Sequence, residues 1–262
     1  METEEILAEI KGADMVLVGL GEDFDDTLRL RDCFEYVRGK ELLQESEYAW
    51  LMPAWKEYCS GRLEDIISPV LKKLAGLLED KNYFVIATAA DSRIAAAPWK
   101  QDRLVMPCGS TGQKQCTGEQ CHQIEAVTAG ERERMQAAFE ELFAGRFPAD
   151  GMPKLAKCSQ CGADMVLNHI FAENYNEQGY LDRWQVYTKW LQGTLNRRLL
   201  VLELGVGMRF PSVIRWPFEK IAYFNKKAIF IRVNEKLYQL TEELSGKGYG
   251  IPKNAIAWLE RL

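Results

Sequence analysis

The stretch RLLVLEL (residues 198–204) decides the fold, together with the glycine turn GVG (205–207) and the apolar run AIFIRV (228–233) that follow it. Both apolar runs are short and continuous, which is typical of strands buried on both faces of a parallel sheet. Residues 217–225, which lie between the two runs, have the pattern of a helix. This stretch therefore predicts a strand–helix–strand unit with parallel strands.

Strand patterns elsewhere in the chain extend this sheet. ADMVLVGL (13–20) is an apolar run that leads into a glycine, YFVIAT (83–88) is a second, and shorter runs occupy 103–106 and 165–170. Helical patterns separate the strands, at residues 1–11, 25–37, 66–78, 125–144, 178–195 and 254–262. This alternation indicates an α/β fold class with a mostly parallel, Rossmann-like sheet.

Two segments lack the alternation and predict a smaller lobe. Residues 40–81 carry aromatic side chains at helical intervals and no strand-like run, which indicates a helical insertion. Residues 111–164 contain four cysteines and one long helical pattern, which indicates a zinc-binding module. The large, Rossmann-like domain is then expected to comprise residues 1–39, 82–110 and 165–262.

Composition and charge exclude several classes of function. The chain has 262 residues, of which 47% are apolar and 27% charged, ordinary values for a soluble globular protein. Lys and Arg number 33 against 38 Asp and Glu, so the net charge of −5 argues against binding nucleic acid or anionic lipid. The start of the chain is acidic, and no run of 18 apolar residues occurs. We therefore expect a cytoplasmic protein with neither a nucleic-acid nor a membrane partner; the sequence leaves the oligomeric state open.

Two pairs of cysteines predict a structural zinc site. Cys116 and Cys121 have the spacing C-x4-C, and Cys158 and Cys161 have the spacing C-x2-C. Each pair presents two thiolates from one tight turn, and four thiolates complete a tetrahedral zinc site with no open position. Such a site would hold the small lobe together and would not take part in chemistry. The alternatives are four unrelated free thiols, or His122 in place of one of the ligands.

The glycine turn after the first strand is an ambiguous nucleotide signal. Gly19 and Gly21 begin a phosphate-binding pattern, but Phe24 takes the place of the third glycine of the dinucleotide fingerprint. Glu22 and Asp23 follow, where a helix N-terminus would meet a pyrophosphate. A carboxylate ~5 Å from a phosphate costs about 3 kcal/mol at an effective dielectric constant of ~20. These acids therefore either oppose a bound dinucleotide or only cap their own helix.

Segments along most of the chain resemble the sirtuin family, and best its bacterial class encoded beside macrodomain proteins. VLELGVG (201–207), PSVIRWPFEKIA (211–222) and IFIRVN (229–234) resemble the second half of a sirtuin. YFVIATAAD (83–91) resembles the strand that leads into the family's T-x-N-x-D motif, and RLVMPCGS (103–110) the strand that leads into its catalytic H-G-S.

The resemblance implies zinc and NAD or ADP-ribose as cofactors. It places the cysteine pairs in the family's zinc module. It also implies that residues 166–174 (VLNHIFAEN) bind a protein or peptide partner in the cleft between the lobes. The positions that match nucleotide-binding residues of the family are Gly19, Gly21, Asp91, Gly205, Gly207 and Asn234.

Three positions depart from the family pattern. Asp23 replaces a serine of the phosphate loop, Ala89 replaces an asparagine at the nicotinamide, and Cys108 replaces the histidine base. An ordinary thiol, with a pKa of ~8.5, accepts a ribose proton poorly at neutral pH. With a positive neighbour, Cys108 would instead be a nucleophile or a redox sensor. Arg209, after the second glycine turn, either offsets the acidic first turn or pairs with Glu22 or Asp23.

Three hypotheses follow for the function. The favoured one is a pseudoenzyme, a sirtuin-like protein that has lost NAD-dependent catalysis and works as a binding or regulatory module. The second is an active NAD-dependent protein ADP-ribosyltransferase or deacylase with altered catalytic residues, Cys108 among them. The third is a scaffold whose cleft binds no nucleotide.

Overall fold

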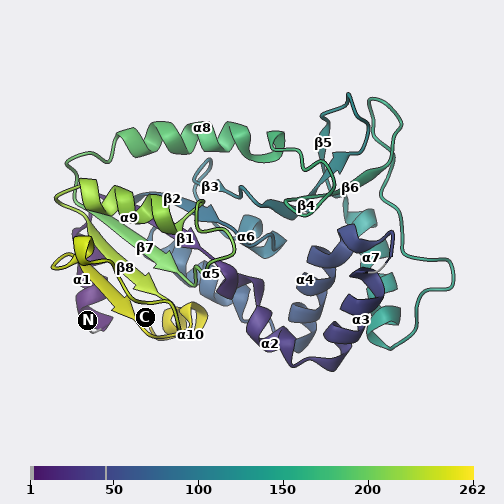
Figure 1. Cartoon of the computed structure of the whole chain (residues 1–262), viewed down its shortest axis with the longest axis horizontal. Helices are drawn as coiled ribbons and strands as arrows, with labels where there is room; N and C mark the ends of the chain where they lie inside the picture. The colour runs from purple at the N-terminus through teal and green to yellow at the C-terminus, as the bar shows by residue number, and fades with distance from the viewer. Residues whose placement is uncertain (1–2, 45) are drawn as a thin grey trace.

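A parallel sheet of six strands forms the centre of the larger lobe (Figure 1). The computed structural model describes residues 3–44 and 46–262. The strand order is β3-β2-β1-β7-β8-β9, and every neighbouring pair is parallel. The strands are β1 (Met15–Leu20), β2 (Asn82–Ala87), β3 (Leu104–Val105), β7 (Leu199–Leu204), β8 (Ile229–Val233) and β9 (Gly248–Ile251). The predicted Rossmann-like α/β class is confirmed.

Side chains of the central strands alternate between two apolar cores, one on each face of the sheet. In β1, Val16 and Val18 face one core, while Met15 and Leu17 face the other. The first core is covered by α1 (Thr3–Gly12), α5 (Ile67–Leu77), α6 (Ser92–Ala96) and α10 (Ala255–Arg261). The second is covered by α8 (Gln178–Gln192), α9 (Arg215–Phe224) and η3 (Glu242–Leu244). Burial on both faces explains why these strands are continuously apolar.

A third core forms the smaller lobe, which lies beside the sheet in Figure 1. Its helical elements are α2 (Thr27–Arg31), α3 (Phe34–Gln44), η2 (Ala49–Leu51), α4 (Met52–Leu63) and α7 (Ala129–Phe143). The short helix η1 (Glu22–Asp25), which precedes α2, instead packs its Phe24 in the first core. An antiparallel sheet in the order β5-β4-β6 completes it, with β4 (Gly109–Cys116), β5 (Ile124–Ala126) and β6 (Met165–His169). Trp55 of α4 is fully buried at the centre of this core and packs against Phe139 of α7.

The packing departs from the predicted division of the chain in three places. α5, predicted within the helical insertion, packs on the large sheet through residues such as Leu71 and Leu74. α2 and most of α3, predicted within the large domain, pack in the smaller core, as Leu30 shows. β6, also predicted within the large domain, pairs with β4, and its Leu167 lies in the smaller core. The division into lobes that behave as separate units stays a prediction.

The sequence patterns also missed or displaced some elements. β4 (GSTGQKQC) is a polar stretch with no apolar alternation, and β9 (GYGI) is only four residues long. The helix predicted from residue 125 begins later, because Ile124–Ala126 pair as β5 and Thr128 caps α7 in a capping box with Glu131. No helix in residues 3–44 or 46–262 combines the length and the apolar character needed to span a membrane.

Candidate functional site

The chain reverses its direction across the sheet between β1 and β7. From β1 it adds β2 and β3 on one side, and after the smaller lobe it adds β7, β8 and β9 on the other. In open α/β sheets such a switch point leaves a crevice at the carboxyl ends of the strands, where ligands bind. Gly21 and Gly205 follow β1 and β7 directly, so both predicted glycine turns meet at this crevice.

The two turns contact each other, and glycine is required at both. The Gly21 N–H donates to the Leu204 carbonyl at 2.9 Å, and a Cβ on Gly21 would lie 2.6 Å from the Val206 nitrogen. Gly205 has a φ of +62°, and a Cβ there would lie 2.5 Å from Cγ of Asp23. These residues bring the backbones of the two turns together at the crevice.

Gly19, predicted as the first glycine of a phosphate loop, allows close packing inside the fold. It lies inside β1, and a Cβ there would lie 2.5 Å from Ile214 and 2.8 Å from Phe218 at the start of α9. Its missing side chain therefore lets α9 pack closely on the sheet. A side chain at this position would point into the core between the sheet and α9.

We expect Gly19→Ala to lower the free energy of unfolding by about 1–3 kcal/mol through overpacking, and to leave nucleotide affinity unchanged. Gly76→Ala is the matched control, because nothing lies within 4 Å of a Cβ at that position in α5. It should stabilise the protein by about 0.5–1 kcal/mol. Urea unfolding of the two variants measures both effects. A Gly19→Ala protein as stable as the wild type would contradict the packing role.

The two acids after Gly21 face different groups. Glu22 reaches the second glycine turn, where its carboxylate accepts hydrogen bonds from the Gly207 N–H and, at 3.1 Å, from the Arg209 N–H. Asp23 turns away and accepts from the Ala255 N–H at 2.8 Å, at the start of α10. Burial raises the pKa of Asp23. The expectation that both acids oppose a pyrophosphate is therefore wrong for Asp23. The alternative, that these acids cap their own helix, is also wrong, because no side chain caps the N-terminus of η1.

Asn234, predicted near the adenosine ribose, supports the second glycine turn. It lies just after β8, and its side-chain amide donates to the Val206 carbonyl at 3.1 Å. Its amide oxygen accepts from the backbone N–H groups of Lys236 and Leu237, at 3.0 and 2.8 Å. The side chain thereby ties the chain after β8 to the glycine turn after β7.

Asp91, predicted to hold the nicotinamide carboxamide, is bound by the chain's own Arg93. The Arg93 guanidinium donates to both carboxylate oxygens, at 2.5 to 3.1 Å, and its N–H donates to the same carboxylate at the start of α6. Arg93 also pairs with Asp65 at 3.0 Å. Burial, assisted by Glu57, raises the pKa of Asp91 to about 6 in spite of the guanidinium. Ala89, at the position without the family's asparagine, packs in the first core, and it is not among the residues that line the cavity described next.

A cavity of about 460 Å³ lies between the two lobes beside the crevice. It brings together Asp91, Cys108 and Arg209, which the sequence singled out, with the carboxylates of Asp25 and Glu57. Other lining residues include Lys40, Lys56, Thr88, Ala90, His169, Phe171 and Phe210. Cavities of this size between lobes are common ligand sites.

Cys108 lies in this cavity as a neutral thiol. It is 2% exposed, and burial raises its pKa to about 12, with Asp25 adding to the rise and Arg209 opposing it. Arg209 is the positive neighbour that would favour a reactive thiolate, but burial and Asp25 outweigh its effect on the pKa. A pKa this high keeps the Cys108 thiol protonated at neutral pH.

His169 lies beside Cys108, although the two residues are far apart in sequence. β4 and β6 are antiparallel, and their register pairs Gly109 with His169. Nδ1 of His169 accepts from the Phe171 N–H at 3.1 Å, so Nε2 carries the proton and donates to the Trp50 carbonyl at 3.1 Å. Burial lowers the pKa of His169. The ring is thus neutral, with both nitrogens engaged.

Four further charged residues of the cavity were not predicted as site residues: Asp25, Lys40, Lys56 and Glu57. Lys56 of α4 pairs with Asp25 of η1 at 3.0 Å, and Arg209 approaches the same carboxylate at 4.0 Å while stacking over Phe171. Glu57 accepts from the Ser92 hydroxyl at 2.5 Å and from the hydroxyl of Thr111. No motif marks these residues, because their helices face the cavity only through tertiary packing.

The four predicted cysteines form a single cluster. Their sulfur atoms lie within 4.8 Å of one another, with 3.3 Å between Cys116 and Cys161 and 3.6 Å between Cys121 and Cys158. Thiolates bound to one zinc ion at ~2.3 Å lie about 3.8 Å apart, so this spacing fits a tetrahedral metal site. His122 is not part of the cluster.

Backbone N–H groups favour the thiolate form of two of these cysteines, although burial raises the pKa of Cys116 overall. The Gly118 N–H donates to Sγ of Cys116 at 3.3 Å. The Cys161 N–H lowers the pKa of Cys158 to about 7. Such N–H···S contacts stabilise the charged form that binds a metal.

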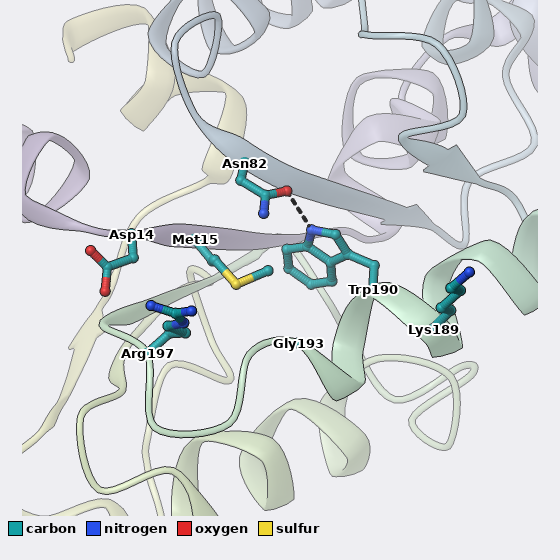
Figure 2. Close-up of a pocket in the computed structure, with 7 residues that line it drawn as sticks. All are labelled: Asp14, Met15, Asn82, Lys189, Trp190, Gly193 and Arg197. Carbon is teal, nitrogen blue, oxygen red and sulfur yellow. Dashed lines mark hydrogen bonds between the residues drawn. The ribbon is translucent and has the colours of Figure 1, made fainter.

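A second cavity lies at the amino ends of β1 and β2, opposite the carboxyl ends where the crevice lies (Figure 2). Asp14 and Met15 at the start of β1 line it, with Trp190 of α8 and Arg197. The Trp190 indole donates to Asn82 at 2.7 Å. None of the predicted site residues lines this cavity, so it is separate from the crevice.

The fold agrees with that of sirtuins. No family model matches the chain. A Sir2 homologue in complex with NAD is similar over 100% of this chain and 92% of its own, with a TM-score of 0.55 and 15% identity. Sir2Tm bound to a propionylated peptide is similar over 100% and 97%, with a TM-score of 0.54 and 14% identity. The chain thus has the sirtuin fold, and the resemblance seen in the sequence is confirmed.

Among curated proteins, a relative with an assigned activity also matches. A protein ADP-ribosyltransferase of Staphylococcus aureus is 23% identical over 264 residues, which cover 93% of this chain and 81% of the relative.

Proposed function

We propose that this protein is a sirtuin-like binding or regulatory module with a cleft for NAD or ADP-ribose, in which sirtuin-type catalysis is impaired. The observation that carries the proposal is the state of Cys108, a buried neutral thiol at the position expected for the base. Losing a general base typically lowers a rate ~10²–10⁴-fold. His169, the histidine nearest in the cavity, is neutral and has both ring nitrogens engaged.

The arrangement of the two glycine turns supports the proposal that the cleft binds NAD or ADP-ribose. Both glycine turns meet at the switch point, and the N–H groups of Gly207 and Arg209 face an anionic acceptor there. A phosphate fits such donors. Gly21 and Gly205 keep the two backbones close, and Asn234 fixes the second turn. When bound, NAD would supply an ADP-ribose unit, and these residues would hold its phosphates.

The cysteine cluster supports zinc as the second cofactor. Cys116, Cys121, Cys158 and Cys161 supply four protein ligands, which leave no position for substrate. Its role would be to fix the strands β4 and β5 and the segment before β6.

A protein or peptide partner in the cleft is the third part of the proposal. Phe171, within the predicted peptide-binding segment 166–174, is 59% exposed beside the cavity, and its ring lies 5.9 Å from that of Phe210. Exposed aromatic side chains at the mouth of a cavity favour contact with a partner. The related Sir2Tm binds an acylated peptide.

One observation favours a second candidate, an active protein ADP-ribosyltransferase. The S. aureus relative of that name matches 93% of the chain. In that case the base would be a carboxylate of the cavity, Asp25 or Glu57, because Cys108 and His169 are unsuited to the role. An assay for transfer of ADP-ribose to a protein acceptor distinguishes the two candidates: the active enzyme would transfer it, and the binding module would not.

Calorimetric titration with ADP-ribose tests the proposed site. We expect saturable binding that NAD competes for, and binding at least several-fold weaker in Asn234→Ala, because the second glycine turn loses its support. Asn82→Ala is the matched control, since Asn82 accepts a hydrogen bond from Trp190 at the amino end of β2, away from the glycine turns. Its affinity should equal that of the wild type. No binding to the wild type, or equal loss in both variants, would contradict the site.

A further inference from the structure

Backbone N–H groups of the second glycine turn already donate hydrogen bonds to an anionic side chain, that of Glu22. The turn begins with Gly205, whose φ of +62° redirects the chain after β7. The N–H groups of Gly207 and Arg209 then point to the same place and donate to the two carboxylate oxygens of Glu22. Backbone N–H groups that converge in this way, here two residues apart, form a concave site for anions.

Glu22 reaches this site from the other half of the sheet. It lies at the end of β1, while its hydrogen-bond partners follow β7, 185 and 187 residues later in the chain. A Cβ on Gly207 would lie 3.0 Å from the Glu22 carboxylate, so the carboxylate fills the space in front of the turn. The Glu22 side chain therefore spans the switch point, where the phosphates of a dinucleotide bind in folds of this type.

We propose that Glu22 is an intramolecular surrogate for a phosphate, and that a phosphorylated nucleotide enters the cleft only by displacing it. The proposal deepens the proposed function and rests on it for the class of ligand, a nucleoside diphosphate. Glu22 thereby determines specificity: it lowers the affinity for ligands that place a phosphate at the turn, and it leaves the affinity for an uncharged nucleoside unchanged.

The position of Glu22 suits such an exchange. The residue is only half-buried, so its carboxylate can rotate into solvent. A phosphate and a carboxylate accept the same charge-assisted hydrogen bonds, and they repel each other when both are present. The ligand must therefore replace the hydrogen bonds of Glu22 before it gains its own.

The test compares three ligands on four proteins by calorimetry: adenosine, ADP-ribose and inorganic phosphate on the wild type, Glu22→Ala, Glu22→Gln and Glu235→Ala. Glu235 is the charge-matched control, because it is exposed and close enough to raise the pKa of Asp23, as Glu22 does. We expect Glu22→Ala to bind ADP-ribose at least tenfold more tightly, which corresponds to ~1.4 kcal/mol. Glu22→Gln should gain less, because its amide oxygen still accepts one hydrogen bond. Adenosine affinity should stay within twofold throughout.

Equal gains for adenosine and ADP-ribose would overturn the proposal, because Glu22 would then only obstruct the cleft. Equal gains in Glu22→Ala and Glu235→Ala would overturn it too, because general charge would explain them. If no protein binds a nucleotide, the proposed function fails, and thermal unfolding with phosphate decides the proposal separately. Phosphate should then raise the Tm of Glu22→Ala and leave that of the wild type unchanged. If Glu22→Ala does not fold, Glu22→Gln takes its place in each comparison.

Discussion

Removal of zinc is expected to unfold the smaller sheet while the large parallel sheet persists. The four sulfurs join three segments of chain: the end of β4, the turn before β5 and the approach to β6. Structural zinc sites of this kind contribute about 10–16 kcal/mol in zinc-finger peptides at neutral pH. Freshly purified protein should contain about one zinc per chain, and Cys158→Ser should contain little. Metal analysis and hydrogen exchange at β4 and β6 measure the two effects.

Cys33→Ser is the control for this prediction. Cys33 is buried but lies outside the cluster, between α2 and α3, so the variant should keep its zinc. Wild-type protein purified without chelators and found free of metal would contradict the zinc site. So would unchanged exchange at β4 and β6 after the zinc is removed.

The second large effect concerns catalysis. We expect NAD-dependent deacylation of acetyl-lysine peptides at least ~10²-fold slower than in a typical sirtuin, because the proton acceptor at position 108 is a neutral thiol. Cys108→His should recover little of the rate, since Arg93 still holds Asp91 and Glu22 still occupies the second glycine turn. Nicotinamide release measured over several hours gives the rate.

The variant Cys108→Ala distinguishes a module that has lost catalysis from an active enzyme that uses Cys108. If the module reading is correct, the variant releases nicotinamide no more slowly than the wild type. A wild-type rate comparable with an ordinary sirtuin, abolished in Cys108→Ala, would contradict the reading and make Cys108 a working catalytic residue.

The elements that the sequence predicted well are those whose signal is local. β1, β2, β7 and β8 are continuously apolar because both of their faces are buried, and their boundaries agree with the predicted runs within one or two residues. The cysteine cluster was predictable because ligand type and spacing carry the chemistry. The turns at Gly21 and Gly205 were predictable because each glycine directly follows an apolar strand; their role in nucleotide binding stays a prediction.

Tertiary contacts decided what the sequence did not reveal. β4 is polar, so its pairing with β6, and with it the placement of His169 beside Cys108, has no signature in the residues. Gly19 fits a phosphate-loop pattern, yet its surroundings are the apolar side chains of α9. Ala89 was read as a position of the nicotinamide pocket, but its side chain lies in the core. A motif fixes the order of residues and not the direction in which each one points.

The central claim is that the cleft holds the dinucleotide and leaves it intact. Incubation of the native protein with NAD, followed by chromatography of the nucleotide recovered from the protein, tests this claim most directly. We predict that the recovered nucleotide is NAD, with no nicotinamide or ADP-ribose above the level of a protein-free control. Stoichiometric nicotinamide together with ADP-ribose, free or attached to protein, would contradict the claim.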